Sequence, residues 1–175
     1  MKSEKNALLD ILKALSASGI KYVICGGVAC VLQGVERATY DIDLSVSLDE
    51  DNINKLIRVT KKFGLIPRIP EPVENLLSED TRNRWIKEKN AMVYTFVSIN
   101  SPLQLDIFLS YPKSYDELFN NADVINIDDI DFIVSSKDDL LFAKKIIPDK
   151  RDKDLIDIKE LNKILDEERK ANKEN

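Results

Sequence analysis

The sequence of 175 residues predicts an α/β (α+β) fold, in which helices flank a mixed β-sheet and further helices follow at the C-terminal end. Two observations predict it. Short apolar runs typical of strands, such as those at 22–25 and 103–109, alternate with segments whose apolar residues recur at helical spacing. Beyond residue 135, Ser136 begins one helical segment and Pro148 separates it from another. This periodicity indicates the class but does not single out one fold within it.

The first part of the chain is expected to combine two helices and two strands around a glycine turn. Leucine and isoleucine recur at helical spacing near the N-terminus, and Gly19 ends that pattern. Asp49 or Asp51 is expected to cap a third helix. The order expected before that helix is a helix over 4–18, a strand over 22–25, a turn at Gly26-Gly27, a helix over 28–33 and a strand over 40–47.

The remaining segments follow from proline positions and apolar runs. Pro67, Pro70 and Pro72 predict a stiff connection without regular structure. A helix with a loop is expected over 73–89, and two strands joined by a hairpin-like connection follow it. The segments expected from there on are strands over 92–98 and 103–109, edge strands over 124–127 and 132–134, helices over 136–147 and 152–168, and a fraying tail over 170–175.

Composition indicates one globular domain over residues 1–175, with a core at about 20–135 and a C-terminal helical part at about 136–168. No apolar run approaches the ~20 residues that a membrane helix needs. The N-terminus leads into an amphipathic helix rather than a signal peptide, so we expect a cytoplasmic protein with no membrane partner. Cys25 and Cys30 match neither a redox nor a zinc spacing and are expected to be buried.

The chain contains no histidine, which excludes Ser-His-Asp and Cys-His catalysis and histidine-ligated metal sites. Carboxylates, lysines and a metal remain for chemistry. The net charge of −5 gives no global attraction to nucleic acid. Residues 144–153 carry five basic side chains against two acidic ones, and this patch either meets phosphates or forms a solvated turn between helices.

Asp41 and Asp43 lie two positions apart in a predicted strand, so their side chains are expected to share a face. Two neighbouring carboxylates repel each other unless a cation lies between them. Hard oxygen ligands suit Mg²⁺, with Mn²⁺ as a substitute, and substrate phosphates complete the coordination. Asp106 on a later strand would complete a site of the kind that activates one oxygen and holds a leaving phosphate.

The segments that carry a family resemblance are Gly26-Gly27 followed by Arg37-Ala38-Thr39-Tyr40-Asp41-Ile42-Asp43-Leu44. They resemble the signature of the nucleotidyltransferase superfamily that includes DNA polymerase beta. The later segments at 140–144 and 151–157 are similar to motifs of small prokaryotic AbiEii toxin-like nucleotidyltransferases. Together these segments span most of the chain, from about Tyr22 to Leu161.

The resemblance implies a role for each matching residue. Asp41, Asp43 and Asp106 would hold metal, and Asp106 would complete the site or act as base. Lys144 would stabilise charge as a catalytic residue, although a shift of one residue would transfer that role to Lys145. The residues assigned to nucleotide binding are Gly26, Gly27, Arg37, Thr39, Asp154 and Asp157.

Each of these residues also has a structural interpretation. The glycine pair could be an ordinary turn, Arg37 could neutralise an inert Asp41–Asp43 pair, and Thr39 could favour the strand by propensity. Asp106 could be an ordinary surface residue. Asp154 and Asp157, which lie on one helix face, could form surface ion pairs with Lys150, Arg151 or Lys153.

The resulting hypothesis is Mg²⁺-dependent transfer of a nucleoside monophosphate from an NTP to an acceptor hydroxyl, with release of pyrophosphate. The family resemblance implies tRNA or a protein as the acceptor, in a toxin-antitoxin or phage-defence system with a cognate partner. Two alternatives stay open. One is a module on the same fold that binds a nucleotide or a partner without transfer, and the other is an antitoxin that modifies a cognate toxin.

Overall fold

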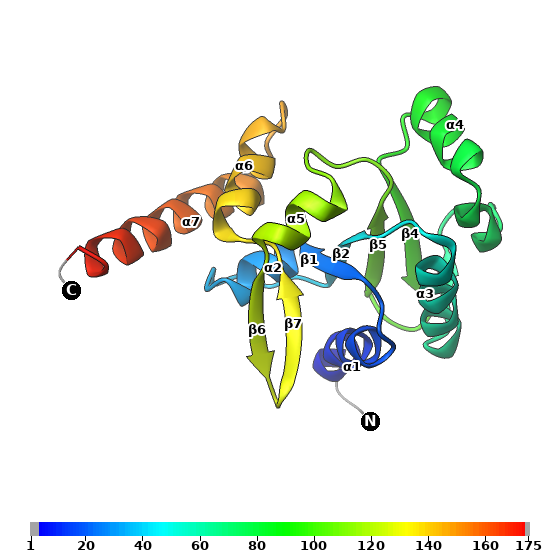
Figure 1. The fold of residues 1–175 in the computed structure, drawn as a ribbon, viewed down its shortest axis with the longest axis horizontal. Coiled ribbons are helices and arrows are strands. Elements are labelled where there is room, and N and C mark those ends of the chain that lie inside the picture. Colours follow the sequence, from blue (N-terminus) through cyan, green and yellow to red (C-terminus); the bar gives the residue numbers. More distant parts are fainter. Residues whose placement is uncertain (1–3, 174–175) are drawn as a thin grey trace.

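The structure is a computed structural model that describes residues 4–173, with side chains from Ala7 onward. Its centre is a seven-stranded mixed sheet in the order β3-β4-β5-β2-β1-β7-β6, with helices packed around it (Figure 1). This architecture confirms the predicted fold class. The strands are β1 (Tyr22–Cys25), β2 (Asp41–Val46), β3 (Leu65–Pro67), β4 (Val93–Ser98), β5 (Gln104–Phe108), β6 (Asp123–Ile127) and β7 (Ile130–Val134).

The helices follow the predicted order, with additions. Asp49 caps the third of them by accepting a hydrogen bond from the backbone amide of Asn52. A 3₁₀ turn, η1 (Val73–Leu77), precedes the fourth helix. The helices are α1 (Glu4–Ala17), α2 (Gly26–Leu32), α3 (Glu50–Lys62), α4 (Glu79–Lys89), α5 (Tyr115–Asn121), α6 (Lys137–Ile146) and α7 (Asp152–Ala171).

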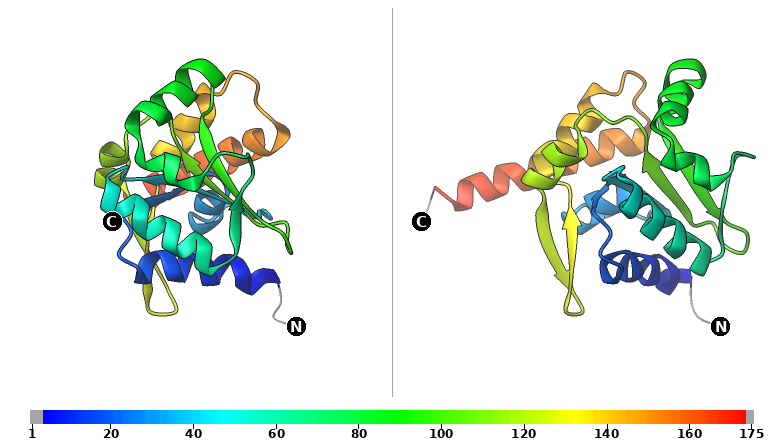
Figure 2. Two further views of the ribbon diagram at one scale, coloured as in Figure 1. Left: turned by 90° about the vertical axis from the view of Figure 1, so that its right-hand side faces the viewer. Right: turned by 45° about the vertical axis from the view of Figure 1, so that its right-hand side comes forward.

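The two faces of the sheet differ in their covering. Ile42 and Leu44 of β2 point into the main core, to which α1 and α3 contribute buried leucine and isoleucine side chains. Helices α1 and α3 lie together on this side of the sheet (Figure 2). On the opposite face, Val23 and Cys25 of β1 pack against Leu118 of α5. Because α5 is short, it covers only part of this second face. The uncovered part carries the polar residues of β2 and β5.

Several predicted boundaries need correction. Helix α2 begins at Gly26 itself, so the glycine pair is the first turn of the helix rather than a turn before it. The three-residue strand β3 ends at Pro67, where no regular structure was expected. Proline is tolerated there because β3 is an edge strand and needs no ladder hydrogen bond on its outer side. Strand β7 lies inside the sheet beside β1, so only β6 of the predicted pair is an edge strand.

Helix α7 extends away from the body of the molecule, whereas α6 packs against α2 and α7 (Figure 1). Helix α7 continues through Ala171, three residues beyond the predicted end at 168. The last two residues of the predicted tail lie outside the described part of the chain. Cys25 and Cys30 are buried, as predicted, and both are free thiols. Among residues 4–173, no helix has the length and apolar character needed to cross a membrane.

Candidate functional site

Carboxylates gather on the uncovered face of the sheet, where β2 and β5 run side by side in parallel. Asp41 and Asp43 alternate with the fully buried Ile42, so their side chains share this face. The register places Asp43 opposite Asp106 and Asp41 opposite Gln104. The structure therefore brings Asp41, Asp43 and Asp106 together on neighbouring strands.

Gly26 lies directly against the Asp43 carboxylate. A Cβ atom at Gly26 would lie 1.9 Å from Oδ2 of Asp43, and the backbone there has a φ of +60°. Both features require glycine. At Gly27, a Cβ atom would lie 2.9 Å from Oγ1 of Thr39 and 3.3 Å from Nη2 of Arg37. The two glycines thus allow the first turn of α2 to approach β2 and the segment before it.

Burial shifts the titration of this cluster. Burial, with the nearby Asp106 and Asp41 charges, raises the pKa of Asp43 to about 7, although a hydrogen bond from the Gly27 amide opposes the rise. Burial also raises the pKa of Asp106, against a hydrogen bond from Thr95. Oδ1 of Asp106 is buried and has no hydrogen-bond partner within the described part of the chain. A cation here would relieve the repulsion and supply the missing partner.

A buried lysine on α6 lines the same cleft as the three carboxylates. Lys144 is only 7% exposed, whereas Lys145 points to solvent, so Lys144 is the lysine that faces the site. Its Nζ lies 2.7 Å from Oδ2 of Asp157 and 3.1 Å from Oδ1 of Asp154. Burial is the largest single influence on Lys144 and lowers its pKa, but the hydrogen bonds to Asp157 and Asp154, together with nearby negative charge, outweigh it, so the pKa of Lys144 is raised. The side chain therefore stays protonated.

Two further cations bind the carboxylates of α7. Nη1 of Arg37 lies 2.7 Å from Oδ2 of Asp157, and Nε of Arg151 lies 2.9 Å from Oδ2 of Asp154. Burial would raise the pKa of Asp154, but hydrogen bonds from Arg151 and Lys144 hold it well below its usual range. Arg37 thus pairs with a carboxylate 120 positions away, and its proposed role as the neutraliser of Asp41 and Asp43 is wrong.

The surface interpretation of Asp154 and Asp157 is also wrong, because these residues are only 1% and 0% exposed. Asp154 does pair with Arg151, as that interpretation expected, but in a network that includes the buried Lys144. Of the basic patch at 144–153, Lys144, Arg151 and Lys153 line the cleft, while Lys150 donates to the carbonyl oxygen of Ile147.

The acidic and basic groups face one cleft with a volume of about 430 Å³. Sequence reasoning missed its apolar wall, which the segment after β5 and helix α6 build. The rings of Phe108 and Tyr111 pack there with centroids 4.3 Å apart. No pattern in the sequence marks this wall. Its apolar residues are Met92, Phe108, Tyr111, Pro112, Leu140, Ala143, Ile146 and Ile147.

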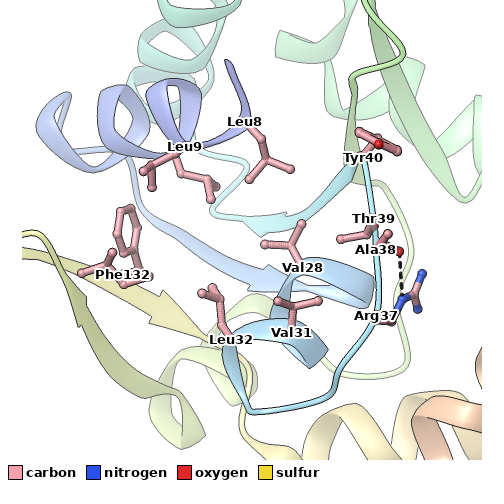
Figure 3. A pocket seen from close by; sticks show the side chains of 12 residues that line it. Leu8, Leu9, Val28, Val31, Leu32, Arg37, Ala38, Thr39, Tyr40 and Phe132 are labelled. Carbon is pink, nitrogen blue, oxygen red and sulfur yellow. Dashed lines mark hydrogen bonds between the residues drawn. The ribbon is translucent and has the colours of Figure 1, made fainter. Parts of the chain in front are cut away.

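A second pocket, of about 290 Å³, lies behind the segment that leads into β2 (Figure 3). Leucine and valine side chains from α1 and α2 line it, and the guanidinium of Arg37 points away from them (Figure 3). Arg37 and Thr39 line both pockets. None of the three carboxylates lines this apolar pocket, so the candidate site is the cleft of about 430 Å³.

The oxygen donors of the cleft fit Mg²⁺ or Mn²⁺ by their chemistry. In the side-chain conformations of the described residues, no three acidic, cysteine or histidine side chains converge on one metal position. The unpartnered Oδ1 of Asp106 and the repulsion around Asp43 nevertheless favour a cation on this face. A cation held by two carboxylates would complete its shell with phosphate oxygens and water.

The chain matches no protein-family model and no curated protein. It is similar to solved structures over most of its length. The lincomycin-bound lincosamide antibiotic adenylyltransferase LnuA is 18% identical, with a TM-score of 0.59 over 94% of this chain and 98% of that one. The antibiotic-resistance factor ANT(2'')-Ia is 14% identical, with a TM-score of 0.60 over 91% of this chain and 83% of that one.

An antigenic nucleotidyltransferase-like protein from Paracoccidioides brasiliensis is 19% identical, with a TM-score of 0.54 over 90% of this chain and 74% of that one. At these identities the likeness concerns the fold. The chain therefore has the nucleotidyltransferase fold, which agrees with the fold implied by the sequence resemblance.

Proposed function

We propose that this protein is a metal-dependent nucleotidyltransferase that transfers a nucleoside monophosphate from an NTP to an acceptor hydroxyl. One observation carries the proposal. The parallel register of β2 and β5 sets Asp43 beside Asp106 and next to Asp41, on the face that lines the cleft with the buried, protonated Lys144. Phosphoryl transfer depends mainly on positioning and electrostatics, which this site supplies without histidine.

In the proposed reaction, the acceptor oxygen attacks the α-phosphorus and the bond from that phosphorus to the bridging oxygen of pyrophosphate breaks. Asp106 would either complete the metal site or take the acceptor proton as a base. Lys144 and Arg37 offer positive charge to the phosphates. Asp41, Asp43 and Asp106 would hold Mg²⁺, which would neutralise phosphate charge when bound. Asp154 and Asp157 would act by holding the cations, and Gly26, Gly27 and Thr39 by shaping the phosphate side.

Two classes of acceptor are proposed. The AbiEii-like resemblance favours tRNA or a protein in the cytoplasm, in a toxin-antitoxin setting. The similar structures favour a second candidate, a small molecule with a free hydroxyl, because LnuA is a lincosamide adenylyltransferase with lincomycin bound. The length match supports this candidate, since the likeness covers 98% of the LnuA chain. Both candidates use the same NTP site.

Calorimetric titration of ATP, GTP, CTP and UTP tests the nucleotide site without any acceptor. With Mg²⁺ present, we expect at least one NTP to bind the wild type and the Asp41→Asn/Asp43→Asn variant to lose that binding. Lys145→Ala serves as the matched control, because Lys145 is exposed and its loss should leave binding unchanged. A folded wild type that binds no NTP contradicts the proposal and favours a module that binds a partner.

A further inference from the structure

A glutamine on β5 contacts the first carboxylate of the site. Gln104 is the register partner of Asp41, and its Nε2 donates a hydrogen bond of 3.0 Å to Oδ1 of Asp41. On its other side, Nη2 of Arg68 donates to Oε1 of Gln104. Gln104 is half-buried, and Arg68 lies just beyond the edge strand β3. The contacts form a chain from an exposed guanidinium through an amide to a carboxylate.

The Arg68 guanidinium and the Asp41 carboxylate together determine the orientation of the Gln104 amide between them. A guanidinium can only donate hydrogen bonds, and an ionised carboxylate can only accept them. The amide of Gln104 has one accepting oxygen and one donating nitrogen, so it satisfies both neighbours in one orientation. In the flipped orientation, its oxygen would face the carboxylate and its nitrogen would face the guanidinium. Arg68 therefore holds Gln104 with its donor directed at Asp41.

The hydrogen bond from Gln104 affects the orientation of the Asp41 carboxylate. A hydrogen bond to Oδ1 restricts rotation of the Asp41 side chain and leaves its other lone pairs for a cation. Asp106 differs, because its Oδ1 is buried and has no hydrogen-bond partner within the described part of the chain. Residues that orient a metal ligand in this way typically contribute ~10–100-fold to metal affinity.

We infer that Gln104 is a positioning residue that holds the Asp41 carboxylate ready for a divalent cation, and that Arg68 acts through Gln104. The inference rests on the proposed metal site. It assigns a role to two residues that the sequence motif does not include. It also explains why a glutamine stands two positions before Asp106 on the face of β5 that carries the site.

Mn²⁺ binding followed by electron paramagnetic resonance tests this role without an acceptor or an NTP. Gln104→Met keeps the length of the side chain but removes its polar atoms, and we expect it to weaken Mn²⁺ binding ~10-fold. Arg68→Met should weaken binding more in the wild type than in the Gln104→Met background, because only the wild type has the amide that Arg68 orients. Arg58→Met, which removes an exposed arginine from α3, is the charge control.

Thermal unfolding of each variant confirms that it is folded at the temperature of the titration. A Gln104→Met protein that binds Mn²⁺ as tightly as the wild type, while Asp41→Asn has lost binding, overturns the inference and leaves the proposed function intact. An equal effect of Arg68→Met in both backgrounds overturns the part assigned to Arg68. A wild type that takes up no Mn²⁺ overturns both the metal site and the inference.

Discussion

Asp43→Asn is expected to raise the free energy of unfolding by about 2–4 kcal/mol at pH 8 in the absence of divalent metal. Ionised Asp43 is buried beside Asp106 and Asp41, which raises its pKa to about 7. A neutral amide of the same shape removes the cost of burying a charge here, together with the repulsion from Asp106 and Asp41. The same change should also weaken Mg²⁺-dependent NTP binding, because a cation ligand is lost. Chemical denaturation with a chelator present measures the stability difference.

The stability difference between the Asp43→Asn variant and the wild type should increase as the pH rises from 4 to 7. The folded pKa of Asp43, about 7, lies above the unfolded value of ~4. Between these pH values the folded state keeps a proton that the unfolded state has lost. Raising the pH from 4 to 7 therefore lowers the stability of the wild type, and the Asn variant should lack this part of the decline.

The control for this experiment is Asp10→Asn, since Asp10 is exposed on α1. It should leave both the stability and its pH dependence close to those of the wild type. If the Asp43→Asn protein is less stable than the wild type at pH 8, the ionised Asp43 side chain stabilises the fold, and this prediction is wrong.

Asp157→Ala is expected to destabilise the protein by about 3–5 kcal/mol. The Asp157 carboxylate is fully buried and binds both Lys144 and Arg37 through Oδ2. Removing it leaves two cations without this partner in a poorly solvated place, which costs more than the ion pair contributes. Denaturant unfolding at pH 7 measures the change.

Asp157→Asn separates charge from hydrogen bonding, because the amide oxygen can still accept a hydrogen bond. We expect a smaller loss of stability for this variant than for Asp157→Ala. If Asp157→Ala unfolds at the same denaturant concentration as the wild type, the network around Lys144 does not stabilise the fold, and the account of α7 is wrong.

Local patterns were enough to predict the carboxylate face. The alternation of Asp41, Ile42 and Asp43 is a local feature of a strand, and side-chain direction follows from it. A Ser-x-x-Glu pattern at Ser114 and Glu117 is a second local signal, because it forms a capping box at the start of α5. Helix α5 is therefore also indicated by a local pattern, although the predicted elements do not include it.

Long-range pairings could not be predicted in the same way. Arg37 pairs with Asp157, 120 positions later, and nothing near either residue indicates the other. The choice between Lys144 and Lys145 depends on how α6 rotates against α7, which tertiary packing decides. The contact between Gln104 and Arg68 also depends on the order of strands β3, β4 and β5, which the chain fixes only on folding.

The most direct test of the central claim is pyrophosphate release from each NTP with Mg²⁺, in the presence of tRNA, a protein extract or a lincosamide. The wild type is expected to release pyrophosphate only when one of these acceptors is present, and to join an equal amount of nucleoside monophosphate to it. The Asp41→Asn/Asp43→Asn variant is expected to release none. A wild type that binds an NTP but releases no pyrophosphate with any acceptor would contradict the account and identify a binding module on this fold.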